Sequence, residues 1–172
     1  MLNRKINSSY LWVAALLLSA LTTKTIANDG VVKAFERTTW ASLQASTEQP
    51  KAAPLIVMFW SLDCAHCGSN MQLLNRFQAP LRIATVATDA LGEGAEIAKR
   101  MREYGARVAE SPAYAFADEP ARLRYSVDKT WRGELPVLYV LQAGRAPQRL
   151  VGAIDTVQLQ AALGQAVRDA KK

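Results

Sequence analysis

Two kinds of hydrophobic pattern alternate along this chain, and they predict strands and helices in turn. Continuous or alternating apolar runs, which are typical of strands, occupy 54–60, 81–87, 137–142 and 149–152. Apolar residues at helical spacing predict helices at 65–77, 92–104 and 156–170, with shorter helical stretches at 34–46 and 119–125. Residues 109–117 are ambiguous, and 114–117 read as a short strand. The order predicts an α/β fold, with a central mixed sheet flanked by helices.

The first 27 residues have the pattern of a secretory signal peptide. Arg4 and Lys5 precede a nearly unbroken apolar stretch at 10–21, which is short for a membrane span of about 20 residues. Small residues at 25–27 predict cleavage after Ala27, and an uncleaved anchor is the alternative. In either case the protein is exported, which in a bacterium means the periplasm, where disulfides persist. The membrane would be contacted only through this N-terminal segment.

Residues 28–172 are enough for one domain with one sizeable core. Loss of the three basic residues of the N-terminal segment lowers the net charge from +6 to +3. No basic cluster with interleaved aromatic residues is present in the sequence, so nucleic acid is not an expected partner.

The only two cysteines, Cys64 and Cys67, form a CxxC motif directly after the apolar run at 54–60. A strand that ends in CxxC and leads into a helix brings the first sulfur to a helix N-terminus, where unpaired N–H groups and the helix dipole stabilise a thiolate. Cys64 is therefore the expected nucleophile and Cys67 the resolving cysteine. An inert structural disulfide is the other interpretation, although so small a ring restricts little chain.

The motif and its surroundings resemble the thioredoxin superfamily. The resemblance rests on Phe59-Trp60-Ser61 before the CxxC and on Glu134-Leu135-Pro136-Val137 about 70 residues later. The stretch at 125–141, followed by Gly144, Val151-Gly152 and Asp155, resembles the TlpA-like branch, which consists largely of exported thiol–disulfide oxidoreductases. The resemblance covers roughly residues 34–167, which is nearly the whole of the expected mature domain, and it implies a thioredoxin-like fold.

The resemblance also implies a substrate site opposite the CxxC. The superfamily has a cis-proline at the position of Pro136, and the backbone of Leu135 would then pair with an extended substrate peptide. Trp131 is a candidate for lining the same surface, with core packing as the alternative. His66, between the cysteines, is expected to favour the Cys64 thiolate and so tune its pKa.

The sequence departs from the family where carboxylates are usual. Met58 stands where thioredoxin has a buried acid, and Asn70 where several TlpA-like reductases have Glu. Asp63 replaces a frequent Trp and would act against a second negative charge. Glu134 is a candidate substitute proton relay, with a solvated loop charge as the alternative.

No cofactor beyond the redox-active disulfide of Cys64 and Cys67 is expected, because the sequence has no nucleotide or flavin motif. The implied partners are exported proteins with thiols or disulfides, such as apocytochrome c or copper-site proteins, and a membrane electron donor of DsbD type. Reduction of these partners is the favoured direction. The alternatives are a disulfide oxidase or isomerase of DsbA type and a Cu(I) chaperone that uses the same two thiolates; a four-ligand zinc site is not expected, since His66 is the only histidine.

Overall fold

The computed structural model describes residues 31–49 and 52–164, which form a six-stranded mixed sheet with the strand order β1-β4-β3-β2-β5-β6. The strands are β1 (Lys33–Phe35), β2 (Leu55–Trp60), β3 (Arg82–Ala90), β4 (Ala113–Phe116), β5 (Val137–Leu141) and β6 (Gln148–Val151). From β1 to β2 all neighbours are parallel, whereas β5 is antiparallel to both β2 and β6.

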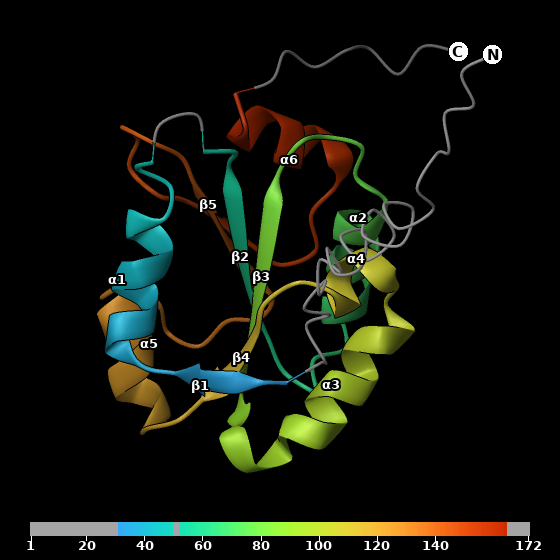
Figure 1. The fold of residues 1–172 in the computed structure, drawn as a ribbon, viewed down its shortest axis with the longest axis vertical. Coiled ribbons are helices and arrows are strands. Elements are labelled where there is room, and N and C mark those ends of the chain that lie inside the picture. Colours follow the sequence, from blue (N-terminus) through green and yellow to red (C-terminus); the bar gives the residue numbers. More distant parts are fainter. Residues whose placement is uncertain (1–30, 50–51, 165–172) are drawn as a thin grey trace, which may run out of the picture.

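Helices cover both faces of the sheet (Figure 1). They are α1 (Arg37–Ala45), α2 (Cys67–Arg76), α3 (Gly94–Glu103), α4 (Ala106–Ala109), α5 (Pro120–Val127) and α6 (Thr156–Ala162). In Figure 1, α1 and α5 lie on one side of the strands, and α2, α3 and α4 lie on the other. The predicted mixed sheet flanked by helices is confirmed.

The unbroken apolar run of β2 is explained by burial on both sides. All six of its residues are buried, and alternate side chains enter two different clusters. Ile56, Met58 and Trp60 join the cluster that includes Cys67 of α2, whereas Val57 and Phe59 join the cluster under α1 and α5. Because successive side chains of a strand point to opposite faces, only a strand with two covered faces needs this composition.

Several element boundaries differ from the sequence expectations. The stretch expected to be one helix from residue 34 begins with strand β1, and α1 starts only at Arg37. Helix α4, a single turn, was not predicted, and α2 starts at Cys67 instead of Ala65. Asp155 is confirmed as the N-cap of α6, and its carboxylate accepts the N–H of Gln158 at 2.8 Å.

The expected signal segment and the part of the expected final helix beyond residue 164 lie outside the described residues. Within 31–49 and 52–164, no helix is long and apolar enough to cross a membrane.

Candidate active site

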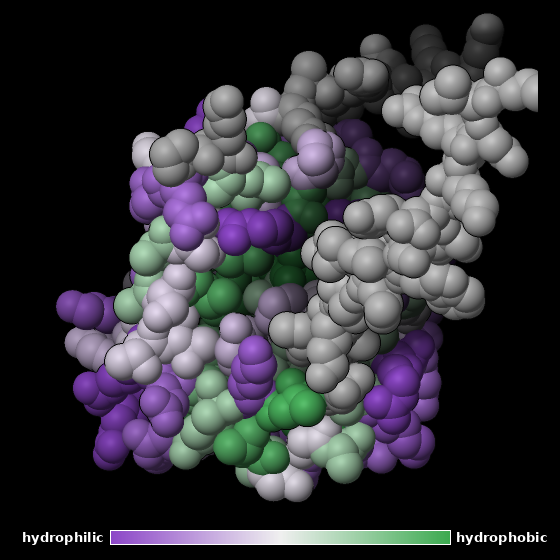
Figure 2. Space-filling view, viewed as in Figure 1, coloured by the Kyte–Doolittle hydropathy of each residue, from purple (hydrophilic) through white to green (hydrophobic). Residues whose placement is uncertain are grey.

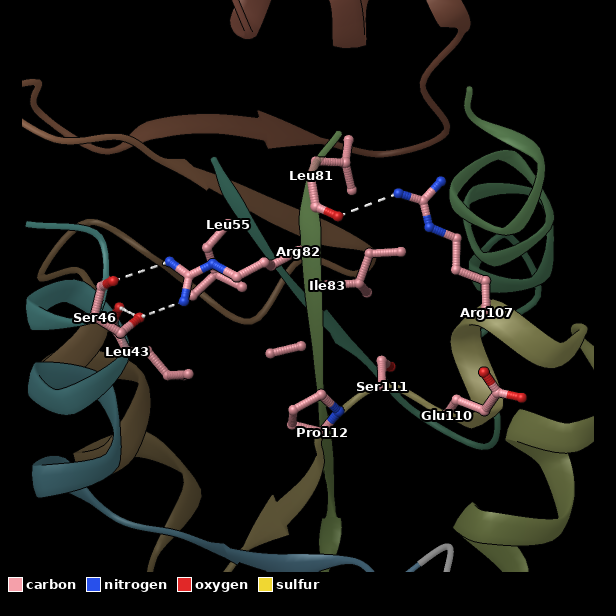
Figure 3. Close-up of a pocket in the computed structure, with 11 residues that line it drawn as sticks. Leu43, Ser46, Leu55, Leu81, Arg82, Ile83, Arg107, Glu110, Ser111 and Pro112 are labelled. Carbon is pink, nitrogen blue, oxygen red and sulfur yellow. Dashed lines mark hydrogen bonds between the residues drawn. The ribbon is translucent and has the colours of Figure 1, made fainter. Parts of the chain in front are cut away.

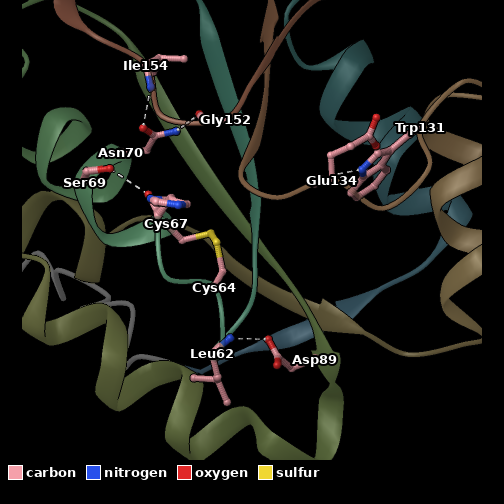
Figure 4. The surroundings of a disulfide bond; sticks show 11 residues. Leu62, Cys64, Cys67, Ser69, Asn70, Asp89, Trp131, Glu134, Gly152 and Ile154 are labelled. Carbon is pink, nitrogen blue, oxygen red and sulfur yellow. Dashed lines mark hydrogen bonds between the residues drawn. A yellow bond between two sulfur atoms is a disulfide. The ribbon is translucent and has the colours of Figure 1, made fainter.

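A disulfide between Cys64 and Cys67 lies where β2 passes into α2 (Figure 4). The two Cα atoms are 5.4 Å apart, and the N–H of Cys67 donates to the C=O of Cys64 at 3.2 Å. The N–H of Cys64 in turn donates to the C=O of Ser61 at 3.2 Å. These turns bring the chain from the end of the central strand directly to the helix N-terminus.

The two sulfur-bearing residues have different environments. Cys67 is the first residue of α2 and is fully buried, whereas Cys64 precedes the helix and is partly exposed. A reagent from solvent therefore reaches Cys64 first. The N-terminal N–H groups of α2 lie beside this turn, and they and the helix dipole favour negative charge there.

Pro136 lies at the same end of the sheet as the disulfide. The register pairs Val137 with Phe59, which places Pro136 level with Trp60, the last residue of β2. The Leu135–Pro136 peptide bond is cis. Among the hydrogen bonds of the described residues, none uses the backbone N–H or C=O of Leu135. This residue, which is only partly buried, therefore offers one backbone donor and one backbone acceptor.

Asn70, one turn after Cys67 in α2, connects the two halves of this region. Its side chain is fully buried; its Nδ2 donates to the C=O of Gly152 at 2.9 Å, and its Oδ1 accepts the N–H of Ile154 at 3.0 Å (Figure 4). The N–H of Gly152 donates to the C=O of Pro136 at 2.8 Å. In the sequence, Asn70 was noted only because it stands where several TlpA-like reductases have Glu. The sequence signal that could have revealed this contact is a polar residue on the inner face of a predicted helix.

Asp89 is a second residue that sequence reasoning missed. One carboxylate oxygen accepts the N–H of Leu62 at 3.0 Å, which fastens the segment before the disulfide to β3 (Figure 4). Asp89 lies where the β3–β4 register shifts, between Ala87 and Ala90. Such irregularities turn a side chain toward a new neighbour and are frequent beside functional sites.

Glu134 is held in an ion pair and not near the sulfur atoms. Its carboxylate accepts from the backbone N–H of Arg132 at 2.9 Å and pairs with Arg149 at 3.1 Å. Its own backbone N–H, that of Arg132 and the charge of Arg149 hold the pKa of Glu134 below its ordinary value. Figure 4 shows Glu134 set apart from Cys64. The ion pair and the lowered pKa favour the alternative of a loop charge, and the role of Glu134 as a proton relay stays a prediction.

Trp131 also differs from the expectation that it lines a substrate surface. It is 4% exposed and packs edge-on against Phe59, with ring centroids 4.8 Å apart. Its indole N–H donates to the C=O of Glu134 at 3.0 Å. Trp131 is therefore a core residue, and its hydrogen bond to Glu134 supports the segment before Pro136 from the core side.

His66 is the exposed N-cap residue of α2, and its side chain makes no capping hydrogen bond. Its influence on the Cys64 thiolate stays a prediction. Within the described part of the chain, no group of three or more His, Cys, Asp or Glu side chains is arranged to hold a metal ion.

A hollow of about 470 Å³ lies at the opposite end of the sheet, near the first residues of β2 and β3. Figure 2 shows its hydrophobic floor, and Figure 3 shows two guanidinium groups at its sides. Arg82 donates to the C=O of Ser46, and Arg107 to the C=O of Leu81. Both arginines therefore fasten chain segments around the hollow, which has no residue in common with the disulfide region.

The sequence matches no family model and no curated protein. Solved structures do match. A secreted disulfide oxidoreductase of Mycobacterium tuberculosis, described as homologous to E. coli DsbE, has a TM-score of 0.51 and 16% identity, over 72% of this chain and 84% of that chain. The fold is thioredoxin-like.

Two further structures are similar at lower scores. M. tuberculosis DsbF in mixed oxidised and reduced forms has a TM-score of 0.47 and 14% identity, over 66% of this chain and 80% of that chain. StoA from Bacillus subtilis has a TM-score of 0.42 and 14% identity, over 66% and 84% respectively. The structural neighbours thus include thioredoxin-like disulfide oxidoreductases, and this chain has the fold together with a CxxC disulfide.

Proposed function

We propose that this protein is an exported thiol–disulfide oxidoreductase whose Cys64/Cys67 dithiol reduces disulfides of partner proteins and is itself oxidised to the Cys64–Cys67 disulfide. One observation carries the proposal: Cys64 is partly exposed and Cys67 is fully buried, at the end of the sheet where Pro136 also lies. A purely structural disulfide has no need of this asymmetry, whereas an exchange reaction needs one accessible sulfur and one protected sulfur.

The proposed reaction has two displacement steps. In the reduced protein the Cys64 thiolate attacks one sulfur of a substrate disulfide, which breaks that bond and releases the other substrate sulfur as a thiolate. The Cys67 thiolate then attacks the Cys64 sulfur, breaks the mixed disulfide and releases the second substrate thiolate. The protein ends as the disulfide and the substrate as a dithiol, so two electrons pass to the substrate.

The free backbone groups of Leu135 support a mode of substrate binding. An extended peptide next to this residue would pair with its N–H and C=O as a short added strand. Because only backbone groups would pair, this mode of binding would depend little on the substrate's sequence. It would bring a substrate cysteine toward Cys64. Trp131, which is 4% exposed, would support this segment from the core through its hydrogen bond to the C=O of Glu134.

We favour the reductase direction, of the TlpA-like kind, with exported partners such as apocytochrome c or copper-site proteins. A membrane donor of DsbD type would then return two electrons to the Cys64–Cys67 disulfide after each cycle. If His66 were protonated, its positive charge would stabilise the Cys64 thiolate and so the reduced form. This would raise the reduction potential of the pair and favour oxidation of partner proteins. The reduction potential decides between the two directions.

Trapping of the intermediate tests the reaction itself. The Cys67→Ser protein should accumulate a mixed disulfide with a disulfide-bonded substrate such as insulin, because its Cys64 adduct cannot be resolved. The Cys64→Ser protein should not, since Cys67 is buried, and the exposed Ser69→Ala change serves as a control that turns over normally. If neither cysteine variant traps substrate, and both lose Cu(I) binding present in the wild type, the Cu(I) chaperone replaces this proposal.

The direction is tested by equilibrating the protein with a glutathione or dithiothreitol series. A potential near about −270 mV supports a reductase, and one near about −120 mV supports a disulfide donor of DsbA type. Export is tested by the mass of the protein in the periplasmic fraction, which should correspond to a chain that begins at Asn28.

A further inference from the structure

One loop supports both halves of the candidate site. The segment from Gly152 to Ile154, just after β6, contacts Pro136 through the N–H of Gly152 and contacts Asn70 through the C=O of Gly152 and the N–H of Ile154. Asn70 belongs to the helix that begins with Cys67. The position of Cys67 relative to Pro136 is therefore fixed through two residues, Asn70 and Gly152.

The two bonds of Asn70 require a side chain that both donates and accepts, as a neutral amide does. A backbone C=O only accepts and a backbone N–H only donates, so the side chain between Gly152 and Ile154 must do both. An ionised carboxylate, such as the Glu of several TlpA-like proteins, has no proton to donate to the C=O of Gly152. Asn70 is also fully buried, where an unsatisfied polar group costs about 1–3 kcal/mol. A side chain that cannot both donate and accept would therefore leave a buried group at this position without a partner.

The resolving step depends most on this arrangement. Attack of Cys64 on a substrate is bimolecular and starts from a partly exposed residue. Attack of Cys67 on the mixed disulfide is intramolecular, and it needs the Cys67 sulfur in line with the bond that breaks. A misplacement of about 1 Å can cost on the order of 100-fold in rate for such a step.

We propose that Asn70 is a positioning residue for the resolving step, and that it acts by clamping the helix of Cys67 to the loop that holds Pro136. The proposal rests on the proposed exchange function. It assigns to Asn70 a mechanical role at a position where a carboxylate would handle protons, so the clamp affects the second displacement and leaves the first unchanged.

The two displacements can be observed separately with 5,5′-dithiobis(2-nitrobenzoate), an aromatic disulfide. One equivalent added to the reduced protein releases one coloured thionitrobenzoate on attack by Cys64, and a second when Cys67 resolves the adduct. In Asn70→Leu, which removes both bonds, the first phase should keep its rate within about two-fold, and the second should slow by about ten-fold or more. Asn70→Asp keeps the shape and the acceptor for Ile154 but loses the donor to Gly152, and it should slow the second phase as well.

Asn75 provides the matched control. It lies in the same helix, and its Oδ1 accepts the N–H of Arg107 at 3.1 Å, so Asn75→Leu also removes a bond from the helix to a neighbouring segment. Its two phases should run at wild-type rates, even where denaturation shows a loss of stability similar to that of Asn70→Leu.

The outcomes separate the two proposals. A wild-type protein that releases only one thionitrobenzoate refutes the exchange function, and the clamp proposal is refuted with it. A wild-type protein that releases two, together with a folded Asn70 variant whose second phase is unchanged, refutes the clamp alone. Equal slowing in Asn75→Leu refutes it too, because the effect would then reflect general loss of stability.

Discussion

The carboxylate of Asp89 accepts the backbone N–H of Leu62 at 3.0 Å, across 27 residues of sequence. Asp89 belongs to β3, and Leu62 lies two residues before Cys64. The segment that carries the exposed cysteine is therefore fastened to the neighbouring strand by a charged acceptor. Together with the Asn70 contacts on the other side, this bond leaves the CxxC turn supported at both ends.

Loss of the Asp89 acceptor should loosen the segment before the disulfide. Asp89→Ala leaves the N–H of Leu62 without its partner and should lower the free energy of unfolding by about 1–2 kcal/mol, measured by denaturant titration. Asp89→Asn keeps an acceptor oxygen and should cost less than half as much. Equal losses in the two variants would contradict a role for this hydrogen bond.

Arg149 forms ion pairs with Asp128 at 3.7 Å and with Glu134 at 3.1 Å, and these pairs predict how the free energy of unfolding depends on pH. The pKa of Asp128 is lowered by the hydroxyl of Thr130, by its backbone N–H, by Tyr139 and by Arg149, and that of Glu134 is lowered as described above. Because both folded-state values are depressed, the two carboxylates stabilise the folded state above their unfolded pKa values of about 4. That stabilisation is lost as the pH falls through the folded values.

The corresponding variant is Arg149→Gln. It should make the fall in unfolding free energy below about pH 4 only slightly shallower, because the hydrogen bonds to Asp128 and Glu134 lower the two pKa values more than Arg149 does. It should cost no more than about 1 kcal/mol at neutral pH, since the paired groups are partly solvated. Arg145→Gln is the control, because Arg145 bonds to Gln142 and to no carboxylate among the described residues. An unchanged acid profile in Arg149→Gln would show that these pairs do not set the pH dependence.

The core position of Trp131 gives a prediction of its own. Trp131→Phe keeps an aromatic ring against Phe59 but removes the N–H that Glu134 accepts. It should cost about 1 kcal/mol of unfolding free energy, since the C=O of Glu134 loses this hydrogen bond. Trp60→Phe is the comparison, because the indole N–H of Trp60 has no hydrogen-bond partner within the described residues, and it should cost less on the same denaturation assay.

Gly105 is required by both its backbone and its neighbours. It has φ +115°, and a Cβ there would lie 2.3 Å from Nδ2 of Asn75. Gly105→Ala should therefore lower the unfolding free energy by about 2 kcal/mol or more. Gly144→Ala, at φ +66° with nothing within 4 Å of the added Cβ, should cost only about 1 kcal/mol. Similar thermal shifts in the two variants would argue against the Asn75 clash.

The fold was largely predictable, because long apolar runs and helical periodicity dominate its core. The pattern at 54–60 identified the central strand, and Asp155 identified the start of α6. Strand β1 was not predictable, since three residues show no periodicity and its partner β4 lies about 80 residues away. Helix α4 is too short for its pattern to be distinguished from a turn.

The cysteine pair was predictable because its chemistry is visible in two residues, whereas its supports were not. Asn70 finds Ile154 across 84 residues, and Asp89 finds Leu62 across 27, and nothing local in the sequence marks such partners. Glu134 was recognised from the sequence as a carboxylate near the expected site. Its ion-pair partner, Arg149, was not, because Arg149 becomes its neighbour only when β6 pairs with β5. The sequence likewise left open whether Trp131 lies on the surface or in the core, and only the folded structure shows that it is buried.

The placement of β2 between β3 and β5 has a consequence for how the oxidation state could be observed. Amides of a strand that is paired on both edges and buried on both faces exchange their hydrogens with solvent only when the whole sheet opens. When the opening is global unfolding, its free energy differs between the oxidised and the reduced protein. By the thermodynamic cycle, this difference equals the difference in the free energy of disulfide formation between the folded and the unfolded chain. The rate of amide hydrogen exchange at Ile56 to Phe59 should therefore differ between the oxidised and the reduced protein, and it reports the oxidation state of Cys64 and Cys67.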